Sequence, residues 1–256
     1  MIHPTAIIDP NAQIDSSAEI GPFAVIGPHV RIGAGTRVGP HSVIDGWTEI
    51  GADNQIFHFA AVGGIPQDLK YRGEETWLRI GDRNIIREFA TLQPGTVSGI
   101  NETVIGNENL FMAYCHVAHD CVVGNRVIMA NGSTLAGHVA VEDYAILGGL
   151  SAVHQFTRIG ESAMLSGGAM VGQDVPPYTI AAGDRARVRG VNLVGLRRRG
   201  FSEESIALVK KAYRILVFSR LRLTDALRRI REELPPGPEI LHFVDFIEKS
   251  ERGICR

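Results

Sequence analysis

Cysteine, excess charge of one sign and long apolar runs are all scarce in this sequence. Its 256 residues include only three cysteines, Cys115, Cys121 and Cys255. An odd and sparse set does not make a disulfide framework and indicates a reducing compartment, so we expect a cytoplasmic protein. Cys115 and Cys121 stand six residues apart, and we interpret them as small apolar residues of a repeat.

The other absences exclude classes of function. The 26 basic and 28 acidic side chains leave a formal charge of −2, which argues against wholesale binding to nucleic acid or to a membrane surface. No run approaches the ~18 apolar residues that span a bilayer. The N-terminal residues Met1 to Thr5 lack the basic and apolar regions of a secretory signal.

What the chain does contain is a repeat of six residues. An aliphatic side chain, often followed by glycine, recurs at every sixth position. The first series is Ile8, Ile14, Ile20, Ile26, Ile32, Val38, Ile44, Ile50, Ile56 and Val62, and a later one runs from Ile105 to Val171. Neither the helical period nor the strand period gives such a series, whereas a short strand followed by a tight turn does.

Three such units make a triangular coil, and stacked coils form a parallel β-helix with strands about 4.8 Å apart. We therefore predict a β-helix over residues 1–190. Beyond it, Ser202 followed by two glutamates is typical of a helix N-terminus, and apolar residues at helical spacing continue to Ile247. We predict a small helical domain over residues 191–256, which would cap the last coil.

Two stretches break the rhythm. Residues 64–78 separate Val62 from Ile80 by eighteen residues, and residues near 97–103 shift the phase of the repeat. Solenoid proteins carry function on such loops, although a tolerated surface insertion has the same pattern.

Histidines gather in the middle of the repeat. Of the nine in the chain, four fall within about two coils: His116, His119, His138 and His154. Among them, His119 stands two residues after an inward aliphatic residue, as do Gly137 and Gln155 in the next two coils. These three positions are therefore stacked in one column, and the backbone amide of Gly137 should lie about one strand spacing from His119.

A base beside an unhindered N–H suits acyl transfer. The base removes a proton from the nucleophile and the N–H stabilises the oxyanion, and the pKa of histidine lies near neutrality. Asp120, the next residue, could orient the imidazole, or a backbone carbonyl could do so instead.

Other interpretations stay open from the residues alone. The histidines can be polar wall residues of the prism. They can also bind zinc, as three histidines do in hexapeptide-repeat carbonic anhydrases, although the spacing of His116 and His119 is not diagnostic. We expect no metal and no cofactor. Because a prism has flat faces, a site between the subunits of a cyclic trimer is favoured.

Several runs give the chain a more specific resemblance. They are Gln67-Asp68-Leu69-Lys70-Tyr71, Ile80-Gly81-Asp82-Arg83-Asn84, His116-Val117-Ala118-His119-Asp120, Leu135-Ala136-Gly137-His138, Ala152-Val153-His154-Gln155, Gln173-Asp174-Val175-Pro176 and Arg198-Arg199-Gly200-Phe201. With the hexads, they make the chain resemble the UDP-N-acetylglucosamine 3-O-acyltransferases of lipid A synthesis over nearly its whole length. The resemblance implies a left-handed β-helix, a homotrimer, and two substrates, 3-hydroxyacyl-loaded acyl carrier protein and UDP-N-acetylglucosamine.

The resemblance also implies roles for matching residues. His119 would take the proton of the sugar 3-hydroxyl, the Gly137 amide would bind the oxyanion, and Asp120 would support His119. The positions that match substrate contacts are Gln67, Asp68, Leu69, Lys70, Gln93, His116, His138, His154, Gln155, Asn192, Arg198 and Arg199. Gly167 matches the position that limits acyl-chain length, and glycine there predicts a long chain. The basic run at 197–199 suits a diphosphate or the acidic carrier protein.

Two residues depart from the family pattern. Gln93 stands where a histidine lies near the reacting sugar, and Val194 replaces an acid expected near Asn192. Since glutamine keeps hydrogen bonding but does not titrate, a sugar with a 3-amino group in place of the 3-hydroxyl stays an alternative substrate. The related N-acyltransferases are disfavoured because an extra domain precedes their coil, whereas the hexads here begin by Ile8.

Overall fold

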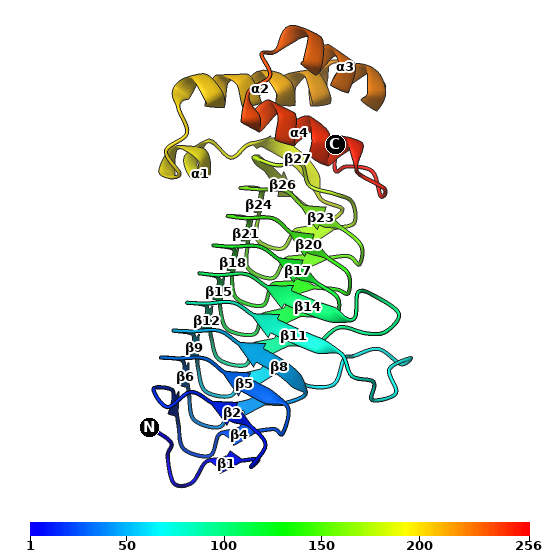
Figure 1. Cartoon of the computed structure of the whole chain (residues 1–256). Coiled ribbons are helices and arrows are strands. Elements are labelled where there is room, and N and C mark those ends of the chain that lie inside the picture. The colour runs from blue at the N-terminus through cyan, green and yellow to red at the C-terminus, as the bar shows by residue number, and fades with distance from the viewer.

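The computed structural model describes all 256 residues, and most of them form an elongated prism with helices at its C-terminal end (Figure 1). Three parallel sheets make the walls. The first contains β1 (Ile7–Ile8), β4 (Val25–Ile26), β7 (Val43–Ile44), β10 (Ala61–Val62), β13 (Thr91–Leu92), β16 (His116–Val117), β19 (Thr134–Leu135), β22 (Ala152–Val153) and β25 (Met170–Val171).

The other two sheets follow the same order along the prism. The second contains β2 (Gln13–Ile14), β5 (Val30–Ile32), β8 (Trp47–Ile50), β11 (Trp77–Ile80), β14 (Glu102–Ile105), β17 (Val122–Val123), β20 (Ala140–Val141) and β23 (Arg158–Ile159). The third contains β3 (Glu19–Ile20), β6 (Arg37–Val38), β9 (Gln55–Ile56), β12 (Ile85–Ile86), β15 (Leu110–Phe111), β18 (Ile128–Met129), β21 (Ile146–Leu147), β24 (Met164–Leu165), β26 (Thr179–Ala182) and β27 (Arg187–Val191).

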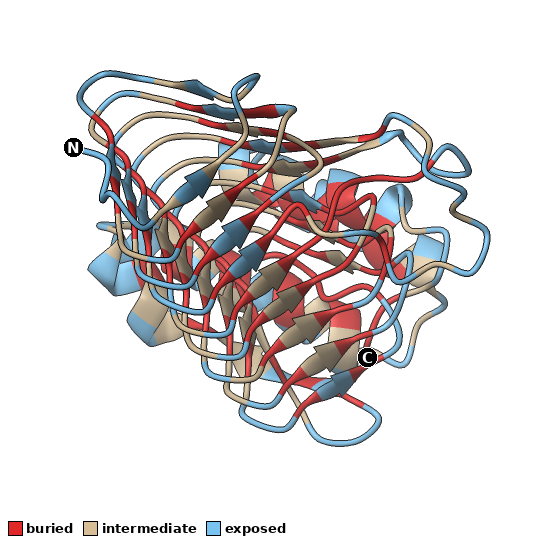
Figure 2. Ribbon diagram, turned by 90° about the horizontal axis from the view of Figure 1, so that it is seen from below, coloured by how far each residue is buried: buried red, intermediate tan, exposed pale blue.

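The predicted β-helix and its register are confirmed. Val117 pairs with Leu135, eighteen residues later, and the same spacing joins most neighbouring strands. The aliphatic residues of the hexads fill the interior, in a core of 42 buried residues. Figure 2, which looks along the prism, shows this buried lining inside each coil. The hexad period alone therefore fixes which side chain of each short strand points inward.

Buried asparagines are stacked along one corner of the prism and hydrogen-bond to the backbone there. The side-chain oxygen of Asn54 accepts from the backbone N–H of Asn84 at 2.8 Å, and that of Asn84 accepts from Asn109 at 2.9 Å. The amide groups of Asn84 and Asn109 also donate to backbone carbonyls of the next coil, both at 3.0 Å. Each side chain thus satisfies backbone groups that the turn leaves unpaired, which is what allows polar residues at buried positions.

Both predicted interruptions are loops that leave the same corner, between the first and second sheets. One joins β10 to β11 and the other joins β13 to β14. They lengthen their coils without breaking the pairing, since Ile80 still pairs with Ile50 and with Ile105. In Figure 1 they project from the right-hand side of the prism.

The C-terminal part is helical, as predicted, with one element that the pattern missed. The helices are α1 (Leu193–Arg198), α2 (Glu203–Phe218), α3 (Leu223–Glu233) and α4 (Pro238–Glu248). Ser202 caps α2 by accepting from Ser205 N. The six residues of α1 are too few for a periodic signal, and Asn192 provides its N-cap. None of these helices has the length and apolar character needed to cross a membrane.

The helical part is joined to the prism at both of its ends. Strand β27 runs antiparallel to β26 on the last coil, and the chain returns after α4, so that Ile254 pairs with Asp174. A second core of 15 buried residues lies among the helices. The helices thus cover the exposed edge of the last coil, which would otherwise present unpaired backbone groups.

Candidate active site

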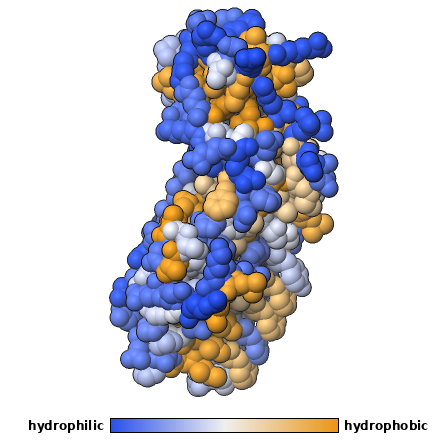
Figure 3. Space-filling view, turned by 90° about the vertical axis from the view of Figure 1, so that its right-hand side faces the viewer, coloured by the Kyte–Doolittle hydropathy of each residue, from blue (hydrophilic) through white to orange (hydrophobic).

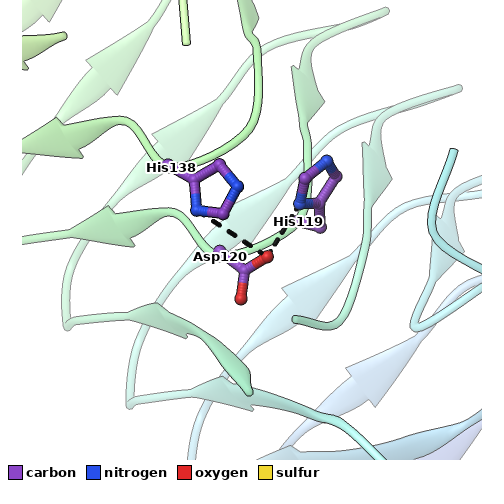
Figure 4. Close-up of side chains that lie close together, drawn as sticks. All are labelled: His119, Asp120 and His138. Carbon is purple, nitrogen blue, oxygen red and sulfur yellow. Dashed lines mark hydrogen bonds and ion pairs between the residues drawn. The ribbon is translucent and has the colours of Figure 1, made fainter. Parts of the chain in front are cut away.

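His119 and Asp120 form a hydrogen-bonded pair at the corner that follows β16. Nδ1 of His119 lies 2.7 Å from Oδ2 of Asp120, and Figure 4 shows the imidazole and carboxylate facing each other. The sequence left open whether Asp120 or a carbonyl orients the ring, and the structure places the carboxylate there. Because Nδ1 is occupied by Asp120, the other ring nitrogen, Nε2, is left for a ligand.

Asp120 is itself held by the second interruption. Its Oδ1 accepts from the backbone N–H groups of Thr96 at 3.0 Å and Ile100 at 2.9 Å, and its Oδ2 accepts from the Thr96 hydroxyl at 2.7 Å. Burial opposes ionisation, but the hydrogen bonds from Thr96 and His119 prevail and lower the pKa of Asp120 below its usual value. The carboxylate is therefore charged and fixed. Thr96 was not predicted, and its only sequence signal is its place beside the interruption.

Gly137 lies against the ring of His119, as the eighteen-residue spacing predicted. A Cβ added to Gly137 would lie 2.5 Å from Cε1 and 2.7 Å from Nε2 of His119, so no side chain fits at this position. Gly137 is buried, and its N–H donates to no group of the chain, although His138 N next to it donates to His119 O at 3.0 Å. Buried backbone N–H groups are nearly always paired, so this free donor next to a base indicates a ligand.

His138 completes the cluster from the next coil. Its ring packs edge-on against His119, with centroids 5.1 Å apart, and stacks on Phe156 at 4.4 Å. Its Nδ1 lies 3.9 Å from the Asp120 carboxylate. Burial lowers the pKa of His138, against the attraction of Asp120, so the ring is held neutral near pH 7. Phe156, which fixes the plane of this ring, was not predicted.

These three groups also include the atoms that a metal would use. His119, Asp120 and His138 offer ligand atoms within 4.8 Å of one another. The separation of 2.7 Å between Nδ1 and the carboxylate is, however, that of a hydrogen bond. Two donors bound to one zinc ion at ~2.0–2.2 Å each would stand farther apart in a tetrahedral site. The geometry is that of a histidine oriented by an acid.

A groove lies along the outer face of the first sheet, and its lining includes His116 and Ala136 but none of the cluster residues His119, Asp120, Gly137 and His138. It has a volume of about 830 Å³, and small side chains at Ala136, Ala152 and Gly172 hollow its floor. His116 and His154 lie on its wall, whereas Gln155 is exposed beside it. His116 Nδ1 is 2.7 Å from the hydroxyl of Thr91, and burial lowers the pKa of His116.

The first interruption carries the predicted residues Gln67 to Lys70. Asp68 is half-buried, and its negative charge acts on His138. Leu69 is 95% exposed and contacts nothing that would explain an apolar residue there. Gln93, from β13's end, lies under this loop and is only 6% exposed. Its side-chain oxygen accepts from Gln67 N at 3.1 Å and its amide nitrogen donates to Ile65 O at 3.3 Å.

The residues expected at the nucleotide end lie elsewhere in the chain. Asn192 is buried, donates to Ser162 O at 2.9 Å and accepts from Gly195 N at 3.0 Å. Arg199 pairs with Glu161. Both partners belong to the corner between the second and third sheets, while His119 belongs to the corner between the first and second. Arg198 is exposed at the end of α1. One chain does not bring these groups beside His119.

Gly167 occupies the third corner, between β24 and β25. A Cβ there would meet only Gly149 O, at 3.5 Å, so the backbone leaves room for a larger side chain. The glycine is exposed and does not line the groove within one chain. Its role in acyl-chain length stays a prediction.

Comparisons with known proteins identify relatives of this chain over its whole length. The chain is 55% identical over 255 residues to the acyl-[acyl-carrier-protein]–UDP-N-acetylglucosamine O-acyltransferase of Thermodesulfovibrio yellowstonii, covering 100% of this chain and 99% of that protein. The enzyme of the same name from Janthinobacterium is 52% identical over 260 residues, with 100% and 99% covered. LpxA of Acinetobacter baumannii has the same fold, with a TM-score of 0.97, 48% identity, and 100% and 99% of the two chains covered.

Two family models match parts of the chain. Residues 174–255 match the family described as UDP N-acetylglucosamine O-acyltransferase, domain 2. Residues 11–46 and 102–137 match the bacterial transferase hexapeptide, a unit of six repeats. The UDP-N-acetylglucosamine acyltransferase of Francisella novicida, 42% identical with a TM-score of 0.97, covers 100% of this chain and 94% of its own.

Proposed function

This chain belongs to the acyl-[acyl-carrier-protein]–UDP-N-acetylglucosamine O-acyltransferases, and we propose that His119 is the general base of its reaction. The acyl group is a 3-hydroxyacyl chain carried as a thioester on acyl carrier protein. The acceptor is the 3-hydroxyl of UDP-N-acetylglucosamine, and the product enters lipid A synthesis. No covalent acyl-enzyme is required, because the acceptor oxygen attacks the thioester directly.

Each step has a group in place. Nε2 of His119 takes the proton of the sugar hydroxyl as its oxygen bonds to the thioester carbon, and Asp120 stabilises the imidazolium that forms. The negative charge moves to the former carbonyl oxygen, which accepts from the Gly137 N–H. The intermediate then collapses, the carbon–sulfur bond breaks, and the imidazolium gives its proton to the departing thiolate of the carrier, which leaves as a thiol.

One observation carries this proposal. The unpaired N–H of the buried residue Gly137 lies beside the ring of His119. Nδ1 of that ring is hydrogen-bonded to the charged carboxylate of Asp120. A histidine on the wall of a prism needs no charged aspartate held against its ring. The groove of about 830 Å³ on the first sheet, whose lining includes Ala136 next to Gly137, is lined by eight hydrophobic residues among fifteen, and such a lining suits an acyl chain.

We also propose a homotrimer with sites between subunits. Asn192 and Arg199 face the corner between the second and third sheets, whereas His119 lies at another corner. A sugar nucleotide that reaches both sets therefore contacts two chains. Three prisms packed around an axis would bring one corner of each beside a different corner of its neighbour.

Mixing the protein with UDP-N-acetylglucosamine and a 3-hydroxyacyl carrier protein tests the function directly. Mass spectrometry should detect an acylated sugar nucleotide and no acylated protein. His119→Ala should lower the rate by ~10²–10⁴-fold with an unchanged melting temperature. Full activity in His119→Ala, or an acyl-enzyme trapped on the protein, would contradict the mechanism.

A further inference from the structure

The loop between β10 and β11 is joined to the rest of the chain by very few polar contacts. Residues 64–75 make only two hydrogen bonds to groups outside the segment. Both are made by the side chain of Gln93, which binds Gln67 N and Ile65 O. No ion pair joins the segment to the prism. Figure 3 shows the face from which the loops project, where hydrophilic and hydrophobic patches alternate along the prism.

Within itself the loop is held by several hydrogen bonds. Asp68 Oδ1 accepts from Lys70 N at 2.9 Å, and Tyr71 N donates to Asp68 O at 3.1 Å. The Tyr71 hydroxyl donates to Glu74 O at 2.8 Å. The loop is therefore a preformed unit, and its place relative to the prism depends on how its base is attached.

On the side away from the loop, the backbone of Gln93 is bonded to the wall of the prism. Its backbone N–H donates to Val117 O at 3.0 Å, so it belongs to the wall that carries His116 and, two residues later, His119. With 6% of its surface exposed, the side chain is enclosed between this wall and the loop. Gln93 thus joins β13, which pairs with the strand β16 that precedes His119, to the loop that bears Gln67 and Asp68.

The contact between Gln93 and the loop requires a side chain that both accepts and donates a hydrogen bond, as glutamine does. The loop presents one backbone N–H and one backbone C=O, and the amide end of glutamine offers one acceptor and a donor at a single point. A carboxylate accepts but does not donate, so Glu would leave Ile65 O facing a negative charge. Leucine has nearly the same size and offers neither group.

We propose that Gln93 is a positioning residue that holds the 64–75 loop over the acceptor site. This inference rests on the proposed function, because the loop matters only if the sugar binds beside His119. It also answers the question raised by the sequence. Since both ends of the Gln93 amide are committed to the loop, this side chain does not distinguish a 3-hydroxyl from a 3-amino sugar.

The test uses the assembled, full-length protein with Gln93→Glu and Gln93→Leu. Gln55→Glu, at an exposed position of β9, is the matched control. Lys70 and Arg72 are exposed residues of the loop, so the rate of tryptic cleavage after them reports on its attachment without reference to activity. Gln93→Leu loses both hydrogen bonds, and Gln93→Glu loses the one to Ile65 O and sets a negative charge against that carbonyl, so each variant should speed this cleavage about tenfold while the control stays at the wild-type rate.

Kinetics then link the loop to the site. We expect KM for UDP-N-acetylglucosamine to rise about tenfold, with kcat changed much less, because the loop holds the substrate and not the reacting atoms. The ratio of kcat/KM for the 3-hydroxy and 3-amino sugar nucleotides should stay as in the wild type. Unchanged cleavage, or a ratio that shifts with Gln93, would overturn the proposal.

The two proposals fail separately. If the wild type acylates no sugar nucleotide while cleavage still accelerates in the Gln93 variants, the function is wrong and the attachment stands. If Gln93→Leu does not fold, Gln93→Asn keeps the amide one methylene short of the loop. Faster cleavage in folded Gln93→Asn supports the proposal, and a wild-type rate contradicts it.

Discussion

Gly137 packs against the imidazole of His119 so closely that a Cβ would lie 2.7 Å from Nε2. Gly137→Ala must therefore displace the ring or the backbone that carries the free N–H. We expect kcat to fall by ~10²-fold or more, with a loss of ~1–3 kcal/mol in stability from overpacking. Steady-state kinetics and thermal unfolding measure the two effects.

The matched control for this change is Gly190→Ala. A Cβ at Gly190 meets no atom within 4 Å, so this variant should keep both activity and stability. If Gly137→Ala behaves like Gly190→Ala, the amide of residue 137 takes no part in the reaction.

The Asp120 carboxylate should matter through its charge. Asp120→Asn keeps the shape but removes the charge that stabilises the imidazolium, and we expect kcat to fall by ~10²–10³-fold. It also replaces Oδ2, which accepts from the Thr96 hydroxyl and faces His119 Nδ1, by an amide donor, at a cost of about 1–3 kcal/mol. Asp143→Asn is the control, because Asp143 also accepts a backbone N–H, from Asn125 at 2.8 Å, at a different corner. Comparable rates in the two variants would exclude a special role for Asp120.

His242 joins the helical part to the prism, and its titration should make the stability of the fold depend on pH. His242 of α4 lies 3.0 Å from Glu142 and 3.3 Å from Glu161. These hydrogen bonds raise the pKa of His242 to about 9, against ~6.5 in an unfolded chain. The folded state holds the proton more tightly, so the stabilisation is complete below pH ~6.5 and is lost as the pH rises through about 9.

Unfolding by urea at pH 6 and pH 9.5 tests this linkage. The free energy of unfolding should fall by about 3 kcal/mol across this range through His242, and His242→Gln should remove that dependence. The pH 9.5 stabilities of the two proteins should converge. An equal pH dependence in the variant would contradict the assignment.

Gly167 gives a prediction about specificity. Gly167→Met places a long side chain into the open space at the corner between β24 and β25, where a Cβ meets only Gly149 O at 3.5 Å. If the acyl chain passes this corner, the variant should prefer a shorter 3-hydroxyacyl carrier protein. Competition between two chain lengths, read by mass spectrometry, measures this preference. An unchanged product ratio, or the same shift in Gly190→Met, would refute the role of Gly167.

The sequence by itself determined the coil and the stacking of its residues. Because each regular coil repeats after eighteen residues, a count along the chain places Gly137 beside His119; that both interruptions leave one corner came from the structure, where Val62 and Ile80 lie in different sheets. The hexad aliphatics also identify the core. These results depend only on translation along a regular solenoid, which a one-dimensional pattern contains in full.

Only the tertiary structure decided what the polar side chains bind. Thr96 holds Asp120, Gln93 holds the loop, and the amide of Asn192 is satisfied by Ser162 and Gly195. Such contacts depend on side-chain rotamers and on the paths of the loops. A periodic pattern describes neither, so the same glutamine or asparagine could face substrate or backbone until the fold is known.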